Sequence, residues 1–309
     1  MAVDASATPT PVSPSGALAM ETALEPGRVR LGARRGLRRM LSQRRLVVFG
    51  GFIALLVVVG LLAPVLAPYD PVQTQPAQAL QPPSRAHLLG TDNLGRDTLS
   101  RLIWGARLSI TVAIIAVTIG LAAGVTLGLA AGYVGGGTDD VLSRFIDAML
   151  AFPGILLAIA ITAALGASLP NAMIAVGIIG IPTYFRLTRG QVLQTREHEY
   201  VTAATVLGAS RLRIVGRHIL PNIVNPLIVA ASIAASGAIL SLATLSFIGI
   251  GTQPPTPDWG SMIFLATGYL SISPWLVFAP GVAIFLTVFS FQMFGDALRD
   301  YLDPRLRNR

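Results

Sequence analysis

The sequence predicts an all-α polytopic membrane protein with six transmembrane helices and both termini in the cytoplasm. Of its 309 residues, 53% are hydrophobic and only 12% are charged, whereas a soluble domain carries roughly 25% charged residues. The mean hydropathy is +0.66, and uncharged runs long enough to cross a bilayer recur along the chain. This composition excludes a disordered protein, a coiled coil and a soluble enzyme.

The N-terminal region, residues 1–45, is predicted to be a cytoplasmic tail. Residues 1–27 are rich in Ala, Pro, Ser and Thr, which bury too little apolar area to offset the entropy of ordering, so we expect this part to be disordered. Residues 28–45 contain eight arginines. We interpret this stretch as a topology anchor, with a helix lying on the lipid surface as the alternative.

The first span is predicted over residues 46–67, an uncharged run of 22 residues that can cross ~30 Å of hydrocarbon. A signal peptide is the alternative, but its apolar run is usually only ~7 to 15 residues long. Pro64 and Pro68 close the present run, and no small-residue cleavage site follows it. We expect residues 46–106 to comprise this helix and an extracytoplasmic segment.

Five further uncharged stretches complete the membrane region. They are residues 108–131, 148–169, 170–185, 219–256 and 275–294. The stretch with Pro182 is short, so we expect its helix to continue past Phe185, with Arg186 and Arg189 reaching toward the lipid head groups. Residues 107–298 would form a five-helix core, and residues 299–309 a cytoplasmic tail.

The arginine distribution predicts the orientation. All 23 basic residues are arginine, and 19 of them lie on the side assigned to the cytoplasm, against 4 on the other. This bias is typical of membrane proteins whose cytoplasmic segments are positively charged. We therefore attribute the net charge of +8 to membrane topology, and we expect lipid and not nucleic acid as the partner. Without lysine or cysteine, the chain has neither a Walker A phosphate loop nor a thiolate metal site.

The content of the spans disfavours several functional classes. The five long uncharged stretches contain no ionisable side chain, whereas a proton- or ion-coupled carrier usually has such groups at membrane depth. A channel would need a polar selectivity lining. An intramembrane enzyme would need convergent acids or histidines, but His87, His198 and His218 lie outside the spans. We expect no catalytic residue, and a self-contained channel or carrier is the alternative from another class.

Glycines in the second span form a packing stripe. Gly120, Gly124, Gly128 and Gly132 are spaced by four residues, so they share one face of a helix and permit close approach of a neighbour. Packing within one subunit is the favoured interpretation, and dimerisation between subunits is the alternative.

The extracytoplasmic segment ends in a motif of turn residues and acids, formed by Gly90, Thr91, Asp92, Asn93, Leu94, Gly95, Arg96 and Asp97. The glycines indicate turns, and Asp97 is placed to cap a short helix through Leu99, Leu102 and Ile103. A metal site at Asp92, Asn93 and Asp97 is the alternative, although no fuller ligand set accompanies them.

The longest cytoplasmic connection, residues 186–218, has apolar residues at helical intervals, and Gly208 divides them into two short helices. Neither helix can bury its apolar stripe alone. Each is therefore expected to dock against this protein or a partner.

Several residues of this connection resemble a known family. Glu199, Tyr200, Val201, Thr202, Ala203 and Ala204, then Gly208, then Arg217, His218, Ile219, Leu220, Pro221 and Asn222 resemble the EAA loop of permease subunits of binding-protein-dependent ABC importers. With the extracytoplasmic motif, they resemble specifically the second permease subunit of the dipeptide, oligopeptide and nickel importers. The resemblance covers residues 40–304.

The resemblance implies a type I ABC importer permease fold in a bacterial inner membrane, with residues 190–220 as the loop that couples to the ATPase. The implied partners are a homologous second permease, two cytosolic ATPases that bind ATP and Mg²⁺, and an external solute-binding protein. The implied cargo is a short peptide, with nickel complexes or haem as alternatives. The family usually has glutamate where this chain has Thr202, so we do not expect an ion pair to the ATPase there.

Overall fold

The computed structural model describes residues 43–302. The chain divides into two units, Met1–Arg44 and Arg45–Arg309, and the architecture below is that of the second. Residues 1–42 of the predicted tail lie outside the described residues, as do residues 303–309, whereas Arg44 and Arg45 of its arginine-rich part begin α3.

The described residues are mostly helical, with longer irregular segments at 67–97 and 248–258 and no strand beyond one isolated bridge. The helices of the N-terminal half are α3 (Arg44–Leu61), α4 (Ala63–Leu66), η2 (Pro76–Gln78), α5 (Thr98–Val134), α6 (Gly136–Leu150) and α7 (Gly154–Leu165). Those of the C-terminal half are α8 (Leu169–Arg196), α9 (Glu199–Val206), α10 (Arg211–Ile214), η3 (Val215–Ile219), α11 (Leu220–Phe247), α12 (Trp259–Ala266), η4 (Thr267–Tyr269) and α13 (Trp275–Leu302).

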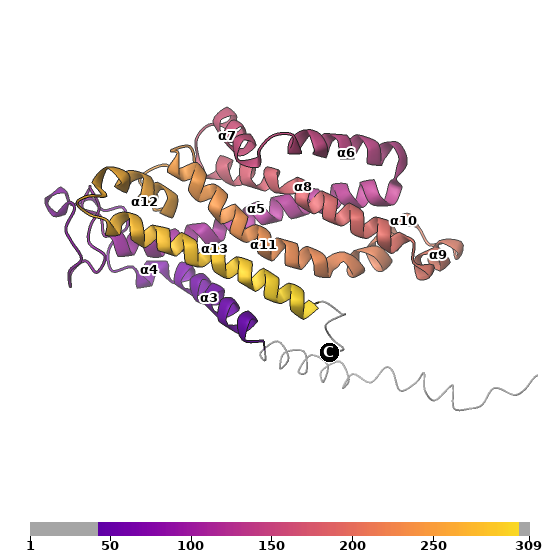
Figure 1. Cartoon of the computed structure of the whole chain (residues 1–309), viewed down its shortest axis with the longest axis horizontal. Helices are drawn as coiled ribbons and strands as arrows, with labels where there is room; N and C mark the ends of the chain where they lie inside the picture. The colour runs from indigo at the N-terminus through magenta and orange to yellow at the C-terminus, as the bar shows by residue number, and fades with distance from the viewer. Residues whose placement is uncertain (1–42, 303–309) are drawn as a thin grey trace, which may run out of the picture. The chain divides into compact units, whose positions relative to one another are not determined.

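Helices α5 and α8 form the centre of this unit, and the glycine stripe explains their close approach (Figure 1). A Cβ atom placed on Gly124 would lie 2.7 Å from the Ile181 carbonyl oxygen, and one on Gly128 would lie 2.7 Å from the Thr188 Cβ. Gly120 and Gly132 also face α8. The prediction that the stripe packs within the subunit is therefore confirmed.

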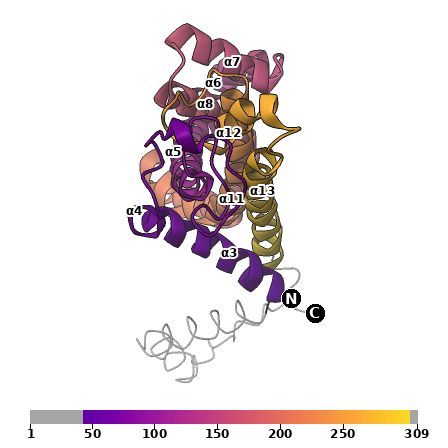
Figure 2. The same cartoon turned by 90° about the vertical axis from the view of Figure 1, so that its left-hand side faces the viewer.

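The other long helices cover this central pair on different sides, as the end-on view shows (Figure 2). Helix α11 packs on both through a buried cluster that includes Val112, Val176 and Leu242. Helix α13 lies against α11 (Figure 1), and α3 meets α13 through an edge-on contact of Phe49 with Phe289, with ring centroids 5.6 Å apart.

Four described helical segments are long and apolar enough to cross a membrane: α3, α5, the run 211–247 and α13. The pair α6 and α7 is bent by 91° and would make a fifth if it counts as one span. Helix α8 occupies the place of the remaining predicted span, and its 28 residues measure about 42 Å at 1.5 Å per residue. The all-α, six-segment architecture is thus as the sequence predicts.

Three predicted boundaries were wrong. The short helix expected after Asp97 is the first part of α5, which runs unbroken for 37 residues. The predicted third span begins inside α6 and is interrupted before Gly154, because Pro153 cannot donate the backbone bond that a continuous helix needs. The fifth ends at Phe247, where a turn with Gly249 at φ +84° replaces the helix.

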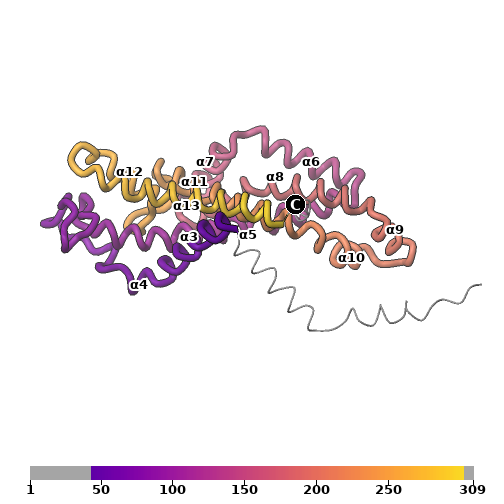
Figure 3. Tube along the Cα trace, turned by 60° about the horizontal axis from the view of Figure 1, so that its bottom comes forward, coloured from indigo at the N-terminus to yellow at the C-terminus, as the bar shows by residue number. Residues whose placement is uncertain are grey.

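The pairing of α6 with α8 gives two arginines partners that the sequence did not predict. Helix α6 lies beside α8 (Figure 3), and its carboxylates meet the basic side chains of that helix. Arg189 donates to both oxygens of Asp139, at 2.5 and 2.7 Å, and Arg186 donates to Asp147 at 2.7 Å. These arginines therefore have carboxylate partners within the protein itself.

Candidate functional site

A helical hairpin, α9 and α10, connects the ends of α8 and α11 and contains the EAA-like residues (Figure 1). Gly208 has φ +78°, a left-handed conformation that lets α9 end and the chain reverse. Ser210 then caps α10 by accepting a hydrogen bond from the Arg213 backbone N–H at 3.4 Å. The two short helices predicted around Gly208 are confirmed.

The base of the hairpin is anchored by a buried cluster and by contacts between tilted aromatic rings. Val201 of α9 and Ile214 of α10 are buried in one cluster that reaches α8 and α11. The Tyr200 ring lies between those of His198 and His218, with centroids 5.5 and 6.3 Å away. Asn222 donates to the Tyr200 hydroxyl at 3.2 Å, so the first turn of α11 is tied directly to α9.

The tip of the hairpin exposes large aliphatic side chains. Val206 is 82% exposed, Leu207 86% and Leu212 87%. We call these three residues the hairpin tip. Each is more exposed than a folded protein normally leaves such a residue in water, and together they form a surface suited to a partner groove.

The remaining EAA-like residues surround this tip and base. Glu199, Thr202, Ala203, Arg217 and Pro221 are exposed, whereas Ala204 and Leu220 are half-buried. Thr202 therefore faces outward.

The extracytoplasmic motif is locked by hydrogen bonds. Gly90 and Gly95 have φ +69° and +74°, and a Cβ on Gly95 would overlap the Gln75 carbonyl. Asp97 caps α5 by accepting from the Ser100 N–H at 2.7 Å, and its other oxygen lies 2.9 Å from His87 Nδ1. Thr91, which pairs with Asp97 in an isolated antiparallel bridge, is fully buried.

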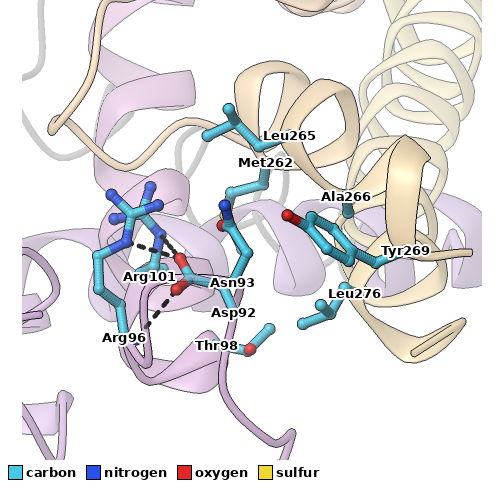
Figure 4. A pocket seen from close by; sticks show the side chains of 10 residues that line it. All are labelled: Asp92, Asn93, Arg96, Thr98, Arg101, Met262, Leu265, Ala266, Tyr269 and Leu276. Carbon is cyan, nitrogen blue, oxygen red and sulfur yellow. Dashed lines mark hydrogen bonds and ion pairs between the residues drawn. The ribbon is translucent and has the colours of Figure 1, made fainter. Parts of the chain in front are cut away.

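Asp92 is the acceptor at the centre of a second network (Figure 4). It accepts from Arg96 Nε at 2.6 Å and lies 3.6 Å from Arg101 Nε. Arg101 is 2% exposed and donates to the carbonyl oxygens of Pro71, at 2.8 Å, and Pro255, at 3.3 Å. The adjoining cavity measures about 20 Å³, which is room for about one water molecule.

Arg101 is the structural residue that the sequence did not reveal. A lone arginine near a span end is ordinarily a topology signal, and only the fold brings two distant carbonyls to it.

Asp258, in the same region, is also buried. Burial raises the pKa of its carboxyl although the Ser261 N–H donates a hydrogen bond to it.

The metal alternative finds no support in this geometry. Protein donors already occupy the carboxylates of Asp92 and Asp97, and residues 43–302 hold no group of three or more acids or histidines that could bind an ion. The capped-turn interpretation is confirmed by the bond from Asp97 to Ser100.

Comparison with known proteins decides the family. The model of the binding-protein-dependent transport system inner membrane component matches residues 124–308. The chain belongs to this family. A second model, the N-terminal transmembrane domain of oligopeptide transport permease C, matches residues 33–83 of the permease. It is thus a membrane transport subunit that works with a binding protein and an ATPase component, and it is not itself an enzyme.

Several curated permeases are similar over most of their length. The permease is 46% identical to the di/tripeptide transport system permease of Pseudomonas aeruginosa, over 83% of this chain and 87% of that protein. It is 44% identical to the dipeptide transport system permease of Haemophilus influenzae, over 83% and 89%. The glutathione transport system permease of Pectobacterium atrosepticum is 41% identical, over 88% and 90%.

A solved structure supports the fold. An inward-facing conformation of the MetNI methionine ABC transporter matches with a TM-score of 0.56 and 17% identity, over 66% of this chain and 98% of that one. The membrane core therefore has the fold of an ABC importer permease.

Proposed function

We propose that this permease forms half of a translocation path for short peptides. The three relatives described above transport dipeptides, di- or tripeptides and glutathione by name, and glutathione is itself a tripeptide. The other half of the path is a homologous second permease. Two cytosolic ATPases and an external solute-binding protein complete the importer.

The hairpin tip is the observation that carries the docking assignment. Three aliphatic side chains more than four-fifths exposed at the cytoplasmic end of the permease require a cover, and a groove of an ATPase subunit supplies one. ATP and Mg²⁺ bind to those subunits, and this chain itself holds no cofactor. Thr202 contributes a hydrogen bond at that surface and no charge.

The hairpin base transmits the motion. Helix α9 follows α8 directly, η3 joins α10 to α11, and Asn222 ties α11 to Tyr200. When ATP closes the ATPase dimer, the docked hairpin moves and carries the ends of α8 and α11 with it. ATP thereby shifts the population between inward-open and outward-open states through its different contacts with the two.

The variant Gly208→Val tests this assignment. A β-branched residue is strongly disfavoured at φ +78°, although the space around Gly208 is open, so the hairpin loses its turn while the spans still insert. We expect peptide uptake and stimulation of ATP hydrolysis to fall at least about tenfold in proteoliposomes, which corresponds to about 1.4 kcal/mol.

Gly281→Val is the matched control, because Gly281 lies in α13 with an ordinary φ and open space around it. Its uptake should stay near that of the native chain. Normal uptake by Gly208→Val would refute the coupling role of the hairpin.

A further inference from the structure

A cavity of about 610 Å³ with both polar and apolar walls lies between the cytoplasmic halves of α8, α11 and α13. Its polar lining comes from all three helices: Gln191 from α8, Asn222 and Asn225 from α11, and Arg299 from α13. Its apolar lining includes Leu187, Val229 and Ile233. The volume lies within the roughly 300 to 1,000 Å³ of small-molecule sites.

Most of these polar groups have no partner in the described part of the chain. Asn222 donates to the His218 carbonyl oxygen and to the Tyr200 hydroxyl. The side chains of Gln191, Asn225 and Arg299, by contrast, form no hydrogen bond or ion pair with any residue between 43 and 302. Asn225 and Arg299 are exposed and Gln191 is half-buried, so two amides and a guanidinium line one hollow and are accessible to a ligand.

The second large hollow of the permease differs in character. A groove of about 750 Å³ between α5 and α11 is lined mainly by aliphatic side chains such as Ile114, Leu121 and Leu227. Such a surface suits lipid or another helix. The contrast shows that the polar lining near the cytoplasmic end is a local feature and not a general property of these helices.

We propose that the cavity between α8, α11 and α13 binds the peptide on its way out, through the peptide backbone and its C-terminal carboxylate. Amide side chains donate and accept, so Gln191 and Asn225 match the N–H and C=O groups that every peptide has. Arg299 matches the carboxylate. The apolar walls accommodate varied side chains. This inference rests on the proposed transport of peptides and adds the residues that contact them.

The cavity is also connected to the docking hairpin. Asn222 lines the cavity and holds Tyr200 of α9. A peptide that takes up the Asn222 amide competes with that bond, so occupancy of the cavity and the position of the hairpin influence one another, as linkage requires.

Cysteine accessibility provides the test, because the native chain contains no cysteine. The complete transporter without its binding protein is reconstituted with the cytoplasmic face outward. Gln191→Cys is labelled by an impermeant thiol reagent, with or without millimolar dialanine. Gln194→Cys is the matched control, since it lies on the same helix, is exposed and does not line the cavity.

We expect dialanine to slow labelling of Gln191→Cys at least about fivefold and to leave Gln194→Cys unchanged. Dialanine amide, which lacks the carboxylate, should need an about tenfold higher concentration for the same protection, because it lacks one charge-assisted hydrogen bond. Adding Arg299→Gln should abolish the difference between the two peptides.

Other outcomes would overturn the inference in distinguishable ways. If the native complex with its binding protein takes up no peptide, the proposed function fails and this inference with it. If it takes up dialanine but Gln191→Cys is not protected, the site alone is refuted. If truncation after Leu302 raises the labelling rate while peptide has no effect, the cavity receives the chain's own C-terminal segment.

Discussion

The two ends of this permease use their polar groups in opposite ways. At the extracytoplasmic end, Asp92, Asp97 and Arg101 are satisfied by neighbours in the same chain and are largely buried. At the cytoplasmic end, Gln191 and Arg299 have no partner within the described residues, and aliphatic side chains of the hairpin tip face outward. The first end is complete by itself, whereas the second is completed by other molecules.

Removing Arg101 tests the completeness of the extracytoplasmic end and should have the largest effect. Arg101→Ala leaves Asp92 with one partner fewer and orphans two carbonyl oxygens. Breaking a buried ion pair costs about 3–5 kcal/mol, so the melting temperature of the purified permease should fall sharply. Arg85 is exposed, and Arg85→Ala should change stability by less than about 0.5 kcal/mol. Equal melting temperatures for Arg101→Ala and Arg85→Ala would show that the hydrogen bonds of Arg101 do not stabilise the extracytoplasmic end.

Widening the contact between α5 and α8 should have the next largest effect on stability. These two helices connect the extracytoplasmic end of the permease to its cytoplasmic end. In Gly124→Ala the new Cβ lies 2.6 Å from the Tyr184 Cβ, and overpacking typically costs about 1–3 kcal/mol. Gly190→Ala on α8, where the space is open, should be neutral or slightly stabilising. The melting temperatures of both variants in detergent test this. Equal values would show that the contact at Gly124 is not tight.

Changing the hairpin tip should affect function and leave stability intact. Leu207→Ser combined with Leu212→Ser removes two exposed side chains that contribute little to the fold. The melting temperature should not move, while ATP-driven uptake should fall about tenfold, which corresponds to the loss of one binding hot spot of more than 1 kcal/mol. A fall in stability of similar size would mean that the tip packs within the permease.

The smallest effect is expected at the ion pair of Arg186 with Asp147, whose side chains are 59% and 63% exposed. Exposed pairs contribute about 0–1 kcal/mol. Asp147→Asn should therefore leave thermal stability and uptake nearly unchanged. A large loss would show that a partner or lipid desolvates this pair in the assembled transporter.

The sequence predicted those features that depend on periodicity and local chemistry. The packing face of Gly120 to Gly132, the cap at Asp97 and the break at Gly208 follow from spacing and backbone preference, and all three are confirmed. The bend between α6 and α7 and the partners of Arg189 were missed, because hydropathy treats a kinked pair as one span and gives no information on which acid meets which base.

The sequence also did not predict the cytoplasmic cavity. Gln191, Asn225 and Arg299 are separated by up to 108 positions in the chain, and amides near span ends are common in membrane helices. Only the packing of α8, α11 and α13 brings them together.

The length of α5 has a mechanical consequence. Its 37 residues run without interruption from the Asp97 cap to Gly135, a rod of about 55 Å. A rod that tilts by about 10° around its midpoint displaces each end by about 5 Å in opposite directions. If α5 behaves as such a lever, narrowing the path on one side of the membrane widens it on the other. The path then cannot be open to both sides at once.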